Sequence, residues 1–291
     1  MNQLTTYIAS PIVSISRFDH PKTIPHRDPR DEIASCYSIN FIEKGSYSLS
    51  VGKRQWRMSH TRLFVTHPGM IFRCRHSQEF PEDVCFSVTY KPEVVDDDDE
   101  ERWLRPSRLG CVVSLTNRFA YLHMRLTHLC ASSRDPLTAE DLAAELLCIA
   151  LERPGLPKRR LYSGKQLAWY VERVEAARHL LKTQYNDAHS LSSIARFTGM
   201  SPFHFARIFR ELTGTPPHRY LMMVRLQQAA KMLLDGATVT ETCFASGFAN
   251  LSHFIRLFQR TFRLSPSQLA KSKKSSAARQ IIECRNSLLD H

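Results

Sequence analysis

The sequence of 291 residues contains no long apolar run. No stretch approaches the roughly 20 consecutive apolar residues that a membrane-spanning helix needs, and no apolar segment follows a basic start as it does in a secretory signal. The eight cysteines lack paired Cys-x-x-Cys spacing, and some, such as Cys130 and Cys148, fall inside apolar helical patterns. These absences disfavour a membrane protein and a disulfide scaffold, so we expect a cytoplasmic protein with ordinary buried cores.

Acidic residues are scarce in the second half of the chain. Residues 1–152 hold 18 Lys and Arg against 20 Asp and Glu, whereas residues 153–291 hold 22 against 8. The net charge of +12 is therefore confined to the second half. This asymmetry is typical of a nucleic-acid-binding half joined to a neutral half, and it disfavours a generally basic surface.

The clearest local pattern lies between residues 190 and 217. Ser190 is the expected N-cap of a short helix that Gly199 ends, and Ser201 followed by Pro202 is a strong start for a second helix. The second helix has a basic exposed side, and its buried stripe is expected to be Phe205, Phe209 and Leu212. Two helices joined at a glycine corner predict a helix-turn-helix, whose second helix enters the DNA major groove.

This pattern recurs in the chain. His204-Phe205-x-Arg207-x-Phe209 returns 49 residues later as His253-Phe254-x-Arg256-x-Phe258, and Pro217 returns as Pro266. Between the copies, residues 220–234 predict one helix that ends at Gly236. Its expected buried positions are Leu221, Val224, Ala229 and Leu233.

These motifs together resemble the AraC/XylS family of bacterial transcription regulators over roughly residues 166–270. The resemblance rests on the repeat above, on Tyr220-Leu221 and Arg225-Leu226, and on Gly247-Phe248 and Ser265-Pro266. It implies that two helix-turn-helix units on one central helix insert their recognition helices into adjacent major-groove turns on one face of the DNA.

Carried over position by position, the resemblance implies a set of DNA-facing residues. They are Ser201, Phe203, His204, Ala206, Arg207 and Arg210 in the first unit, and Asn250, Leu251, Ser252, Ile255 and Arg256 in the second. Among these only the arginines offer bidentate geometry for guanine. The alternative for Arg207 and Arg256 is an exposed or phosphate-bound helix residue.

The second copy departs from the family pattern at three places. Thr242 and Cys243 stand where the family favours a branched aliphatic residue and alanine, Arg263 stands where the first copy has Gly214, and Leu269-Ala270 replace the usual Tyr-Arg. A polar residue toward the core and a non-glycine residue at a left-handed helix end each cost about 1 kcal/mol. We therefore expect the second helix-turn-helix unit to contribute less to DNA recognition than the first.

The first half predicts short, evenly spaced strands. We expect one strand within residues 1–34, at 12–18, a β-hairpin over 37–51 around a turn at 43–46, and further strands at 54–58, 62–66, 70–76 and 84–90. Such spacing indicates a barrel or jelly roll. Ahead of a DNA-binding repeat, it resembles the cupin-like sensor domain of the same family.

The metal-ligand set of enzymatic cupins is missing. Ser38 falls where the resemblance places the Glu ligand, and Phe72 where it places the later His, so we expect no metal, no cofactor and no catalytic residue. The barrel then encloses either a binding cup or a closed core. The candidate lining residues are Phe41, Tyr47, Trp56, Phe64 and Phe72.

A separate cluster brings Cys74 and His76 onto one strand face, with Cys85 on the next strand. Cysteine and histidine are zinc ligands, and Glu79 or Cys36 is the candidate fourth ligand. The alternatives are metal or redox sensing and ordinary packed thiols beside a surface histidine.

The remaining segments complete the domain plan. The acidic run at 96–101 predicts a solvated loop, and residues 116–131 and 138–151 predict two amphipathic helices, which pair two protomers or pack on their own barrel. We expect a sensor barrel at 1–115, a helical pair at 116–152, a linker at 153–164, the double helix-turn-helix domain at 165–272 and a basic tail at 273–291.

The sequence therefore predicts an α+β two-domain protein, with a cupin-like β-barrel or jelly roll plus flanking helices and an all-α tandem helix-turn-helix domain. The expected function is that of a non-enzymatic, sequence-specific transcription regulator, more often an activator in the family. The expected partners are double-stranded promoter DNA, RNA polymerase, a small-molecule effector and a second copy in a homodimer, with no membrane contact. A cupin-type metalloenzyme with a DNA-binding tail and a nonspecific nucleoid-type DNA binder are the alternatives.

Overall fold

The computed structural model describes the chain except for residues 1–2, 21–30, 77–81, 92–110, 153–159 and 272–291. It divides into two compact units, Met1–Leu161 and Tyr162–His291, which are described separately below. The predicted acidic loop at 96–101, the basic tail at 273–291, Glu79 and most of the predicted linker lie outside the described residues. Within the described residues, no helix is long and apolar enough to cross a membrane.

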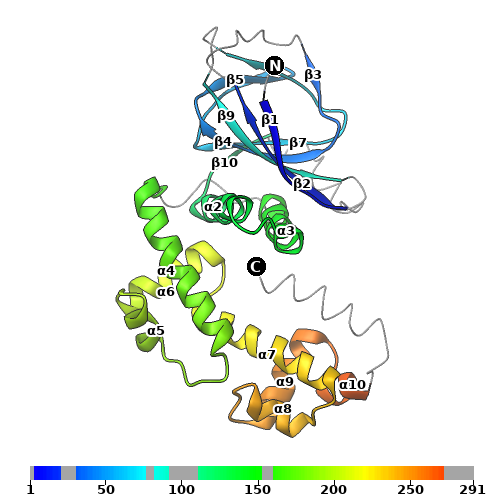
Figure 1. Cartoon of the computed structure of the whole chain (residues 1–291), viewed down its shortest axis with the longest axis vertical. Coiled ribbons are helices and arrows are strands. Elements are labelled where there is room, and N and C mark those ends of the chain that lie inside the picture. The colour runs from blue at the N-terminus through cyan, green and yellow to red at the C-terminus, as the bar shows by residue number, and fades with distance from the viewer. Residues whose placement is uncertain (1–2, 21–30, 77–81, 92–110, 153–159, 272–291) are drawn as a thin grey trace. The chain divides into compact units, whose positions relative to one another are not determined.

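Two antiparallel sheets form the first unit (Figure 1). One sheet has the order β1-β2-β9-β4-β7-β10, and the other has the order β3-β8-β5-β6. The strands are β1 (Gln3–Ala9), β2 (Val13–Asp19), β3 (Glu32–Ile33), β4 (Tyr37–Lys44), β5 (Tyr47–Val51), β6 (Arg54–Met58), β7 (Arg62–Thr66), β8 (Ile71–Arg75), β9 (Val84–Tyr90) and β10 (Val112–Ser114). The predicted strands at 54–58, 62–66 and 84–90 are confirmed, while β1, β3 and β10 were not foreseen.

The predicted hairpin over residues 37–51 is wrong, because its two strands lie in different sheets. β4 pairs with β7 and β9, whereas β5 pairs with β6 and β8. Gly45, with φ of +78°, redirects the chain between the two strands. The alternation of apolar residues identifies strands, but it does not say which strands pair.

The space between the sheets is filled by a cluster of buried side chains. They are Ile42, Tyr47, Leu49, Met58, Phe64 and Met70, with Trp56 and Phe72 packed against them. Four of the five candidate lining residues thus belong to this cluster. Phe41 does not: it lies on the other face of β4 and stacks on His123 of α2 (Asn117–Ala131), with ring centroids 4.4 Å apart.

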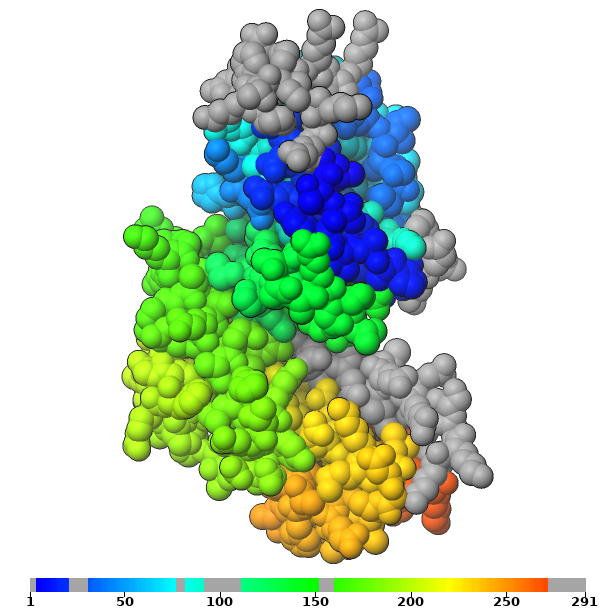
Figure 2. Space-filling view, in the orientation of Figure 1, coloured from blue at the N-terminus to red at the C-terminus, as the bar shows by residue number. Residues whose placement is uncertain are grey.

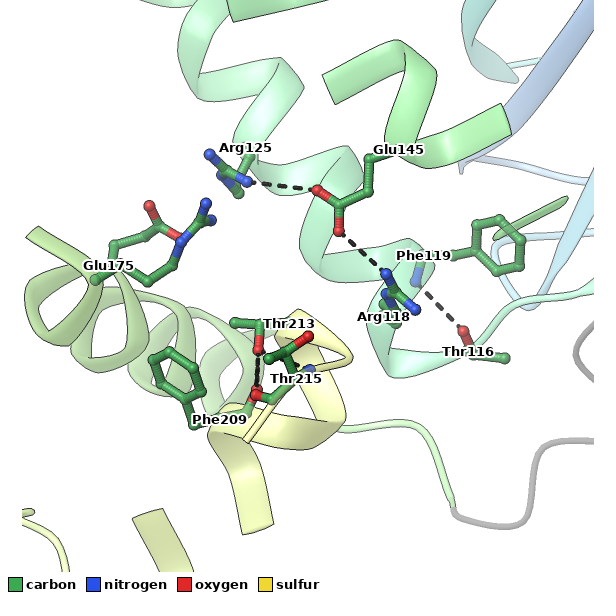
Figure 3. Close-up of polar contacts among 10 residues, drawn as sticks. Thr116, Arg118, Phe119, Arg125, Glu145, Glu175, Phe209, Thr213 and Thr215 are labelled. Carbon is green, nitrogen blue, oxygen red and sulfur yellow. Dashed lines mark hydrogen bonds and ion pairs between the residues drawn. The ribbon is translucent and has the colours of Figure 1, made fainter. Parts of the chain in front are cut away.

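The two helices of the first unit pack on their own sheet. The Tyr90 hydroxyl of β9 donates a hydrogen bond to the carbonyl of Ala143 in α3 (Pro136–Glu152) at 2.8 Å, and His123 contacts Glu43 at 3.0 Å. Thr116 caps α2 by accepting from the Phe119 amide, and the Glu145 carboxylate of α3 pairs with Arg118 and Arg125 of α2 (Figure 3). Figure 2 shows β1, β2 and α3 side by side on one face of this unit.

The second unit is entirely helical in its described residues. Its helices are α4 (Gly164–Thr183), α5 (Leu191–Phe197), α6 (Pro202–Thr213), α7 (Pro217–Asp235), α8 (Val239–Ala245), α9 (Leu251–Phe262) and α10 (Pro266–Lys271). Figure 1 shows α7 running from the group of α4, α5 and α6 to the group of α8, α9 and α10. The expected buried positions of α7, Leu221, Val224, Ala229 and Leu233, are all at most 4% exposed, and Gly236 ends the helix at φ of 103°. The predicted α+β two-domain fold is confirmed.

Candidate DNA-binding interface

The two helix-turn-helix units are built alike, from α5 and α6 and from α8 and α9. Each first helix begins with a reciprocal capping box, made by Ser190 with Ser193 and by Thr238 with Glu241. Each corner contains a glycine at positive φ, namely Gly199 at 67° and Gly247 at 86°. Between the helices lie residues 198–201 in the first unit and 246–250 in the second, so the second corner is one residue longer.

Both recognition helices bury an aromatic stripe and expose a polar side. Phe205 and Phe209 of α6 and Phe254 and Phe258 of α9 are each 0% exposed, and Leu212 is fully buried as well. The expected DNA-facing residues that are exposed are Ser201, Phe203, Arg207 and Arg210 in the first unit and Asn250, Ser252 and Arg256 in the second. Phe203 is 88% exposed, so its ring is accessible at the start of α6.

Some expected DNA-facing residues have structural partners instead. The ring of His204 lies against α4, where its Nε2 is 3.2 Å from the Tyr170 hydroxyl. Leu251 and Ile255 are half-buried and pack against the core of the second unit, and Ala206 is half-buried as well. These four side chains therefore present less surface to a ligand than the repeat alone indicated.

The helix caps of the two recognition helices differ from expectation. Ser201 is the N-cap of α6 and is followed by Pro202, but its hydroxyl makes no capping hydrogen bond. In the second unit Asn250 is the N-cap, and its side-chain oxygen accepts from the His253 amide at 2.9 Å. The oxygen of Asn250 is thus engaged, which leaves its NH₂ group as the outward-facing donor.

The two equivalent arginines have different surroundings. Arg207 lies 3.8 Å from the carboxylate of Glu211 one turn later, and the Tyr162 hydroxyl donates to the same carboxylate at 2.9 Å. The position equivalent to Glu211 in the second unit is Arg260, and Arg256 has no ion-pair partner within the described part of the chain. The guanidinium of Arg207 is therefore oriented by a carboxylate, whereas that of Arg256 is not.

Arg225 of α7 links the two helix-turn-helix units to each other. Its Nε and Nη2 donate to the carbonyls of Tyr185 and Asp187, at 2.7 and 2.8 Å, in the loop before α5. Its guanidinium also lies against Gly247, where an added Cβ would approach Arg225 Cζ and Asn186 Cα to 2.9 Å. Burial lowers the pKa of Arg225 below its ordinary value. The sequence contained Arg225 and Gly247 as family motifs, but this contact between them was not foreseen.

Two of the three expected departures in the second helix-turn-helix unit have a structural correlate, while the third, Leu269-Ala270, packs in its core. Arg263 ends α9 in the left-handed region at φ of 59°, where Gly214 ends α6 at 75°. Thr242 is 0% exposed, and its hydroxyl has no hydrogen-bond partner within the described residues. Cys243 is buried in the core of this unit. Two of these positions, Thr242 and Arg263, are locally unfavourable, and the weaker contribution of this helix-turn-helix unit to DNA recognition stays a prediction.

In the unit Met1–Leu161, the cluster expected around Cys74, His76 and Cys85 is arranged differently. His76 lies with His20 and Asp83, whose potential ligand atoms are within 4.8 Å of one another, and neither cysteine belongs to this group. Burial alone would raise the pKa of Asp83, but hydrogen bonds with His20 and His76 lower it below its ordinary value. Burial and the nearby Asp83 carboxylate raise the pKa of Cys85 to about 12, so its thiol is protonated at neutral pH.

Two helix-turn-helix units joined by one central helix, α7, define a tandem DNA-binding domain. Residues 194–272 match a family model described as a helix-turn-helix domain. An uncharacterized HTH-type transcriptional regulator YbfI of Bacillus subtilis is 30% identical over 228 residues, which covers 75% of this chain and 78% of that protein. The chain belongs to the AraC/XylS family of helix-turn-helix transcription regulators, and it is a DNA-binding transcription regulator.

Other relatives match over shorter segments. An uncharacterized HTH-type transcriptional regulator of Haemophilus influenzae is 31% identical over 134 residues, covering 45% of each chain. The HTH-type transcriptional activator RhaS of Escherichia fergusonii is 33% identical over 97 residues, covering 33% of this chain and 35% of RhaS. The chain thus spans less than half the length of these two relatives.

Proposed function

We propose that the protein binds promoter DNA sequence-specifically, with α6 and α9 in successive turns of the major groove. The observation that carries this proposal is the presentation of two equivalent arginines, Arg207 and Arg256, on helices fixed to the ends of α7. Recognition helices so mounted reach one DNA face when their subsites lie about one helical turn, roughly 10 base pairs, apart. The footprint of one chain is then near 20 base pairs and not palindromic.

The exposed residues of the interface take different roles in this proposal. Arg207, Arg210 and Arg256 are the candidates for guanine or phosphate contacts. Phe203 offers an apolar contact for a thymine methyl group, and Ser252 and the NH₂ group of Asn250 offer polar contacts to a base edge or phosphate. His204, Ala206, Leu251 and Ile255 position the recognition helices, and the exposed Ser201 hydroxyl offers a further polar contact to a phosphate.

The first unit is proposed to sense a small molecule or to form a homodimer through residues 116–152, and it needs no catalytic chemistry for either task. Activation through RNA polymerase is the favoured outcome, because RhaS is named an activator. Binding to promoter DNA would place the protein in the cytoplasm at the nucleoid. We propose the same domain plan as the sequence predicts, with a sensor barrel at 1–115, a helical pair at 116–152, a linker at 153–164, the DNA-binding domain at 165–272 and a basic tail at 273–291.

The test is selection of a binding site from random DNA with the full-length protein. We expect a selected site near 20 base pairs that binds at least about 1,000-fold more tightly than competitor DNA at about 0.15 M salt. The double variant Arg207→Ala/Arg256→Ala should lose this preference, while Arg54→Ala, which removes an exposed charge in the first unit, should retain it. Equal affinity for selected and competitor DNA would identify a nonspecific DNA binder.

A further inference from the structure

Three chain segments from both sheets meet at one end of the first unit. His20 directly follows β2, His76 directly follows β8, and Asp83 directly precedes β9. β2 and β9 are neighbours in the larger sheet, and β8 belongs to the smaller one. The three side chains therefore bridge the two sheets, although His20 and His76 lie 56 positions apart in the sequence.

The three side chains are close and almost completely buried. His20 Nδ1 lies 3.0 Å from Asp83 Oδ2, and His76 Nε2 lies 3.2 Å from Asp83 Oδ1. Their side chains are between 3% and 8% exposed. Two imidazoles and one carboxylate in a dry site provide nitrogen and oxygen donors without competition from bulk water.

The surrounding structure holds these donors in place. The His20 amide donates to the Asp83 carbonyl at 3.2 Å, which continues the ladder between β2 and β9. Gly45 lies so close that an added Cβ would approach Asp83 Cα to 2.7 Å. The rings of Phe18 and Tyr47 lie against His20 and His76, with centroids 5.1 and 5.7 Å apart.

We propose that His20, His76 and Asp83 form a binding site for a divalent transition-metal ion of the zinc type. Zinc takes histidine nitrogen and aspartate oxygen at about 2.0–2.2 Å, so a tetrahedral site places its ligand atoms roughly 3.4 Å apart. One potential ligand atom from each residue already lies within 4.8 Å of the other two, so the donors need only a small adjustment to meet one ion. Three protein ligands leave a fourth position open for water or another exchangeable ligand.

This site differs from the ligand set expected of a cupin, since the residues at two of those positions are Ser38 and Phe72. Ser38 is engaged elsewhere, in a hydrogen bond with the Thr66 hydroxyl at 2.6 Å. The nearby Cys85 is a separate group, and we assign it no ligand role. The proposal does not rest on DNA binding, because the site lies wholly within the first unit.

The test uses untagged full-length protein that has been treated with a chelator and reduced. Zinc is titrated in competition with a chromophoric chelator, and the variants are His20→Asn and His76→Gln. Their amides can place an NH₂ group near the positions of Nδ1 and Nε2 respectively, so each variant removes a metal ligand with little change in side-chain volume. His60→Ala, at an exposed turn, and Cys148→Ser, at an exposed thiol, are the matched controls.

We expect one tightly bound zinc per chain, unchanged in the two controls and weakened at least about 10-fold in His20→Asn and in His76→Gln. Circular dichroism and thermal melting without metal establish that each variant is folded. Added zinc should raise the melting temperature of the parent protein but not of these variants. Absence of tight zinc binding, or binding that survives both folded variants, would overturn the proposal.

Discussion

At the scale of single residues, the two helix-turn-helix units differ in the residue that ends the recognition helix in a left-handed conformation, which is Arg263 in the second unit. It adopts φ of 59° at the end of α9, where a side chain with a Cβ is strained and where the first unit uses Gly214. Arg263→Gly should therefore raise the free energy of unfolding by up to about 1 kcal/mol. Thermal melting of the full-length protein measures this, and Gly214→Ala is the control that should lower the stability.

Thr242 allows a test of what a buried hydroxyl without a hydrogen-bond partner costs in stability. Its buried hydroxyl lacks a hydrogen-bond partner in the described residues, so Thr242→Val should stabilise the protein by about 1 kcal/mol while keeping the side-chain shape. Thr213 is the matched control, because its buried hydroxyl bonds the carbonyls of Phe209 and Thr215 at 2.7 and 2.9 Å (Figure 3). Thr213→Val should destabilise. A loss of stability in Thr242→Val would show that the hydroxyl has a stabilising contact.

The equivalent arginines provide the sharpest test of DNA recognition. Replacing Arg207 or Arg256 with Ala should cost about 1–3 kcal/mol of binding if the arginine reads a base, and each change should relax specificity in a different half of the site. If the arginine holds a phosphate, affinity should instead fall evenly across sequences and the salt slope should drop by about one.

We expect Arg207→Ala to be the more damaging change, because Glu211 orients Arg207 and because Thr242 and Arg263 weaken the second unit. Titration of both variants against the selected site decides the ranking. A larger loss for Arg256→Ala would reverse it, and a single base pair affected by both changes would contradict the arrangement of two subsites.

At the scale of elements, the two capping boxes differ in charge. Glu241 caps α8 as a carboxylate, and hydrogen bonds from Thr238 lower its pKa. A carboxylate whose pKa is lower in the folded protein stabilises the fold at every pH above its pKa in the unfolded chain. This contribution is lost as the pH falls through its pKa in the folded protein. Glu241→Ala should thus lower the melting temperature most above about pH 5, and progressively less in more acidic solution.

The neutral box of α5 is the control for this pH dependence. Ser193→Ala removes the equivalent reciprocal contact with Ser190, but no group in that contact titrates in this range. Its effect on the melting temperature should not follow the acid limb seen for Glu241→Ala. Parallel pH profiles for the two variants would mean that the carboxylate of Glu241 contributes nothing through its charge.

Local chemistry made most helices and several strands predictable. Ser190, Gly199 and Gly236 bound their helices where expected, because caps and left-handed ends depend on the nearest few residues. The partners of β4 and β5 were mispredicted, since pairing depends on residues far along the chain. The group of His20, His76 and Asp83 could not be predicted for the same reason. The capping hydrogen bond of Asn250 was missed because the family resemblance assigned this residue to the DNA-facing set.

At the scale of the whole molecule, we expect the segment from about Lys165 to Lys273 to fold and bind DNA by itself. The unit Tyr162–His291 contains its own buried core. Within it, Arg178 of α4 donates to the Tyr220 hydroxyl of α7, and Arg225 of α7 donates to the Tyr185 carbonyl in the loop that follows α4. Titration against the selected site should give the segment measurable, salt-dependent affinity at about 0.15 M salt. Residues 1–152, which have a slight acidic excess, are the control. Equal affinity of the two fragments would contradict the domain assignment.

The central helix also has a consequence for the arrangement of promoters. α7 has 19 residues, so it is about 28 Å long, which is close to the roughly 34 Å pitch of B-form DNA. Because Arg225 of α7 bonds the loop before α5 and also packs against Gly247, we expect the distance between α6 and α9 to be fixed. If α6 and α9 bind successive major-groove turns as proposed, we expect half a turn of extra DNA between the subsites to put the second one on the far side of the duplex, and a full extra turn to put it out of reach. Evolution of these promoters should therefore tolerate base changes at individual contacts more readily than any insertion or deletion between them.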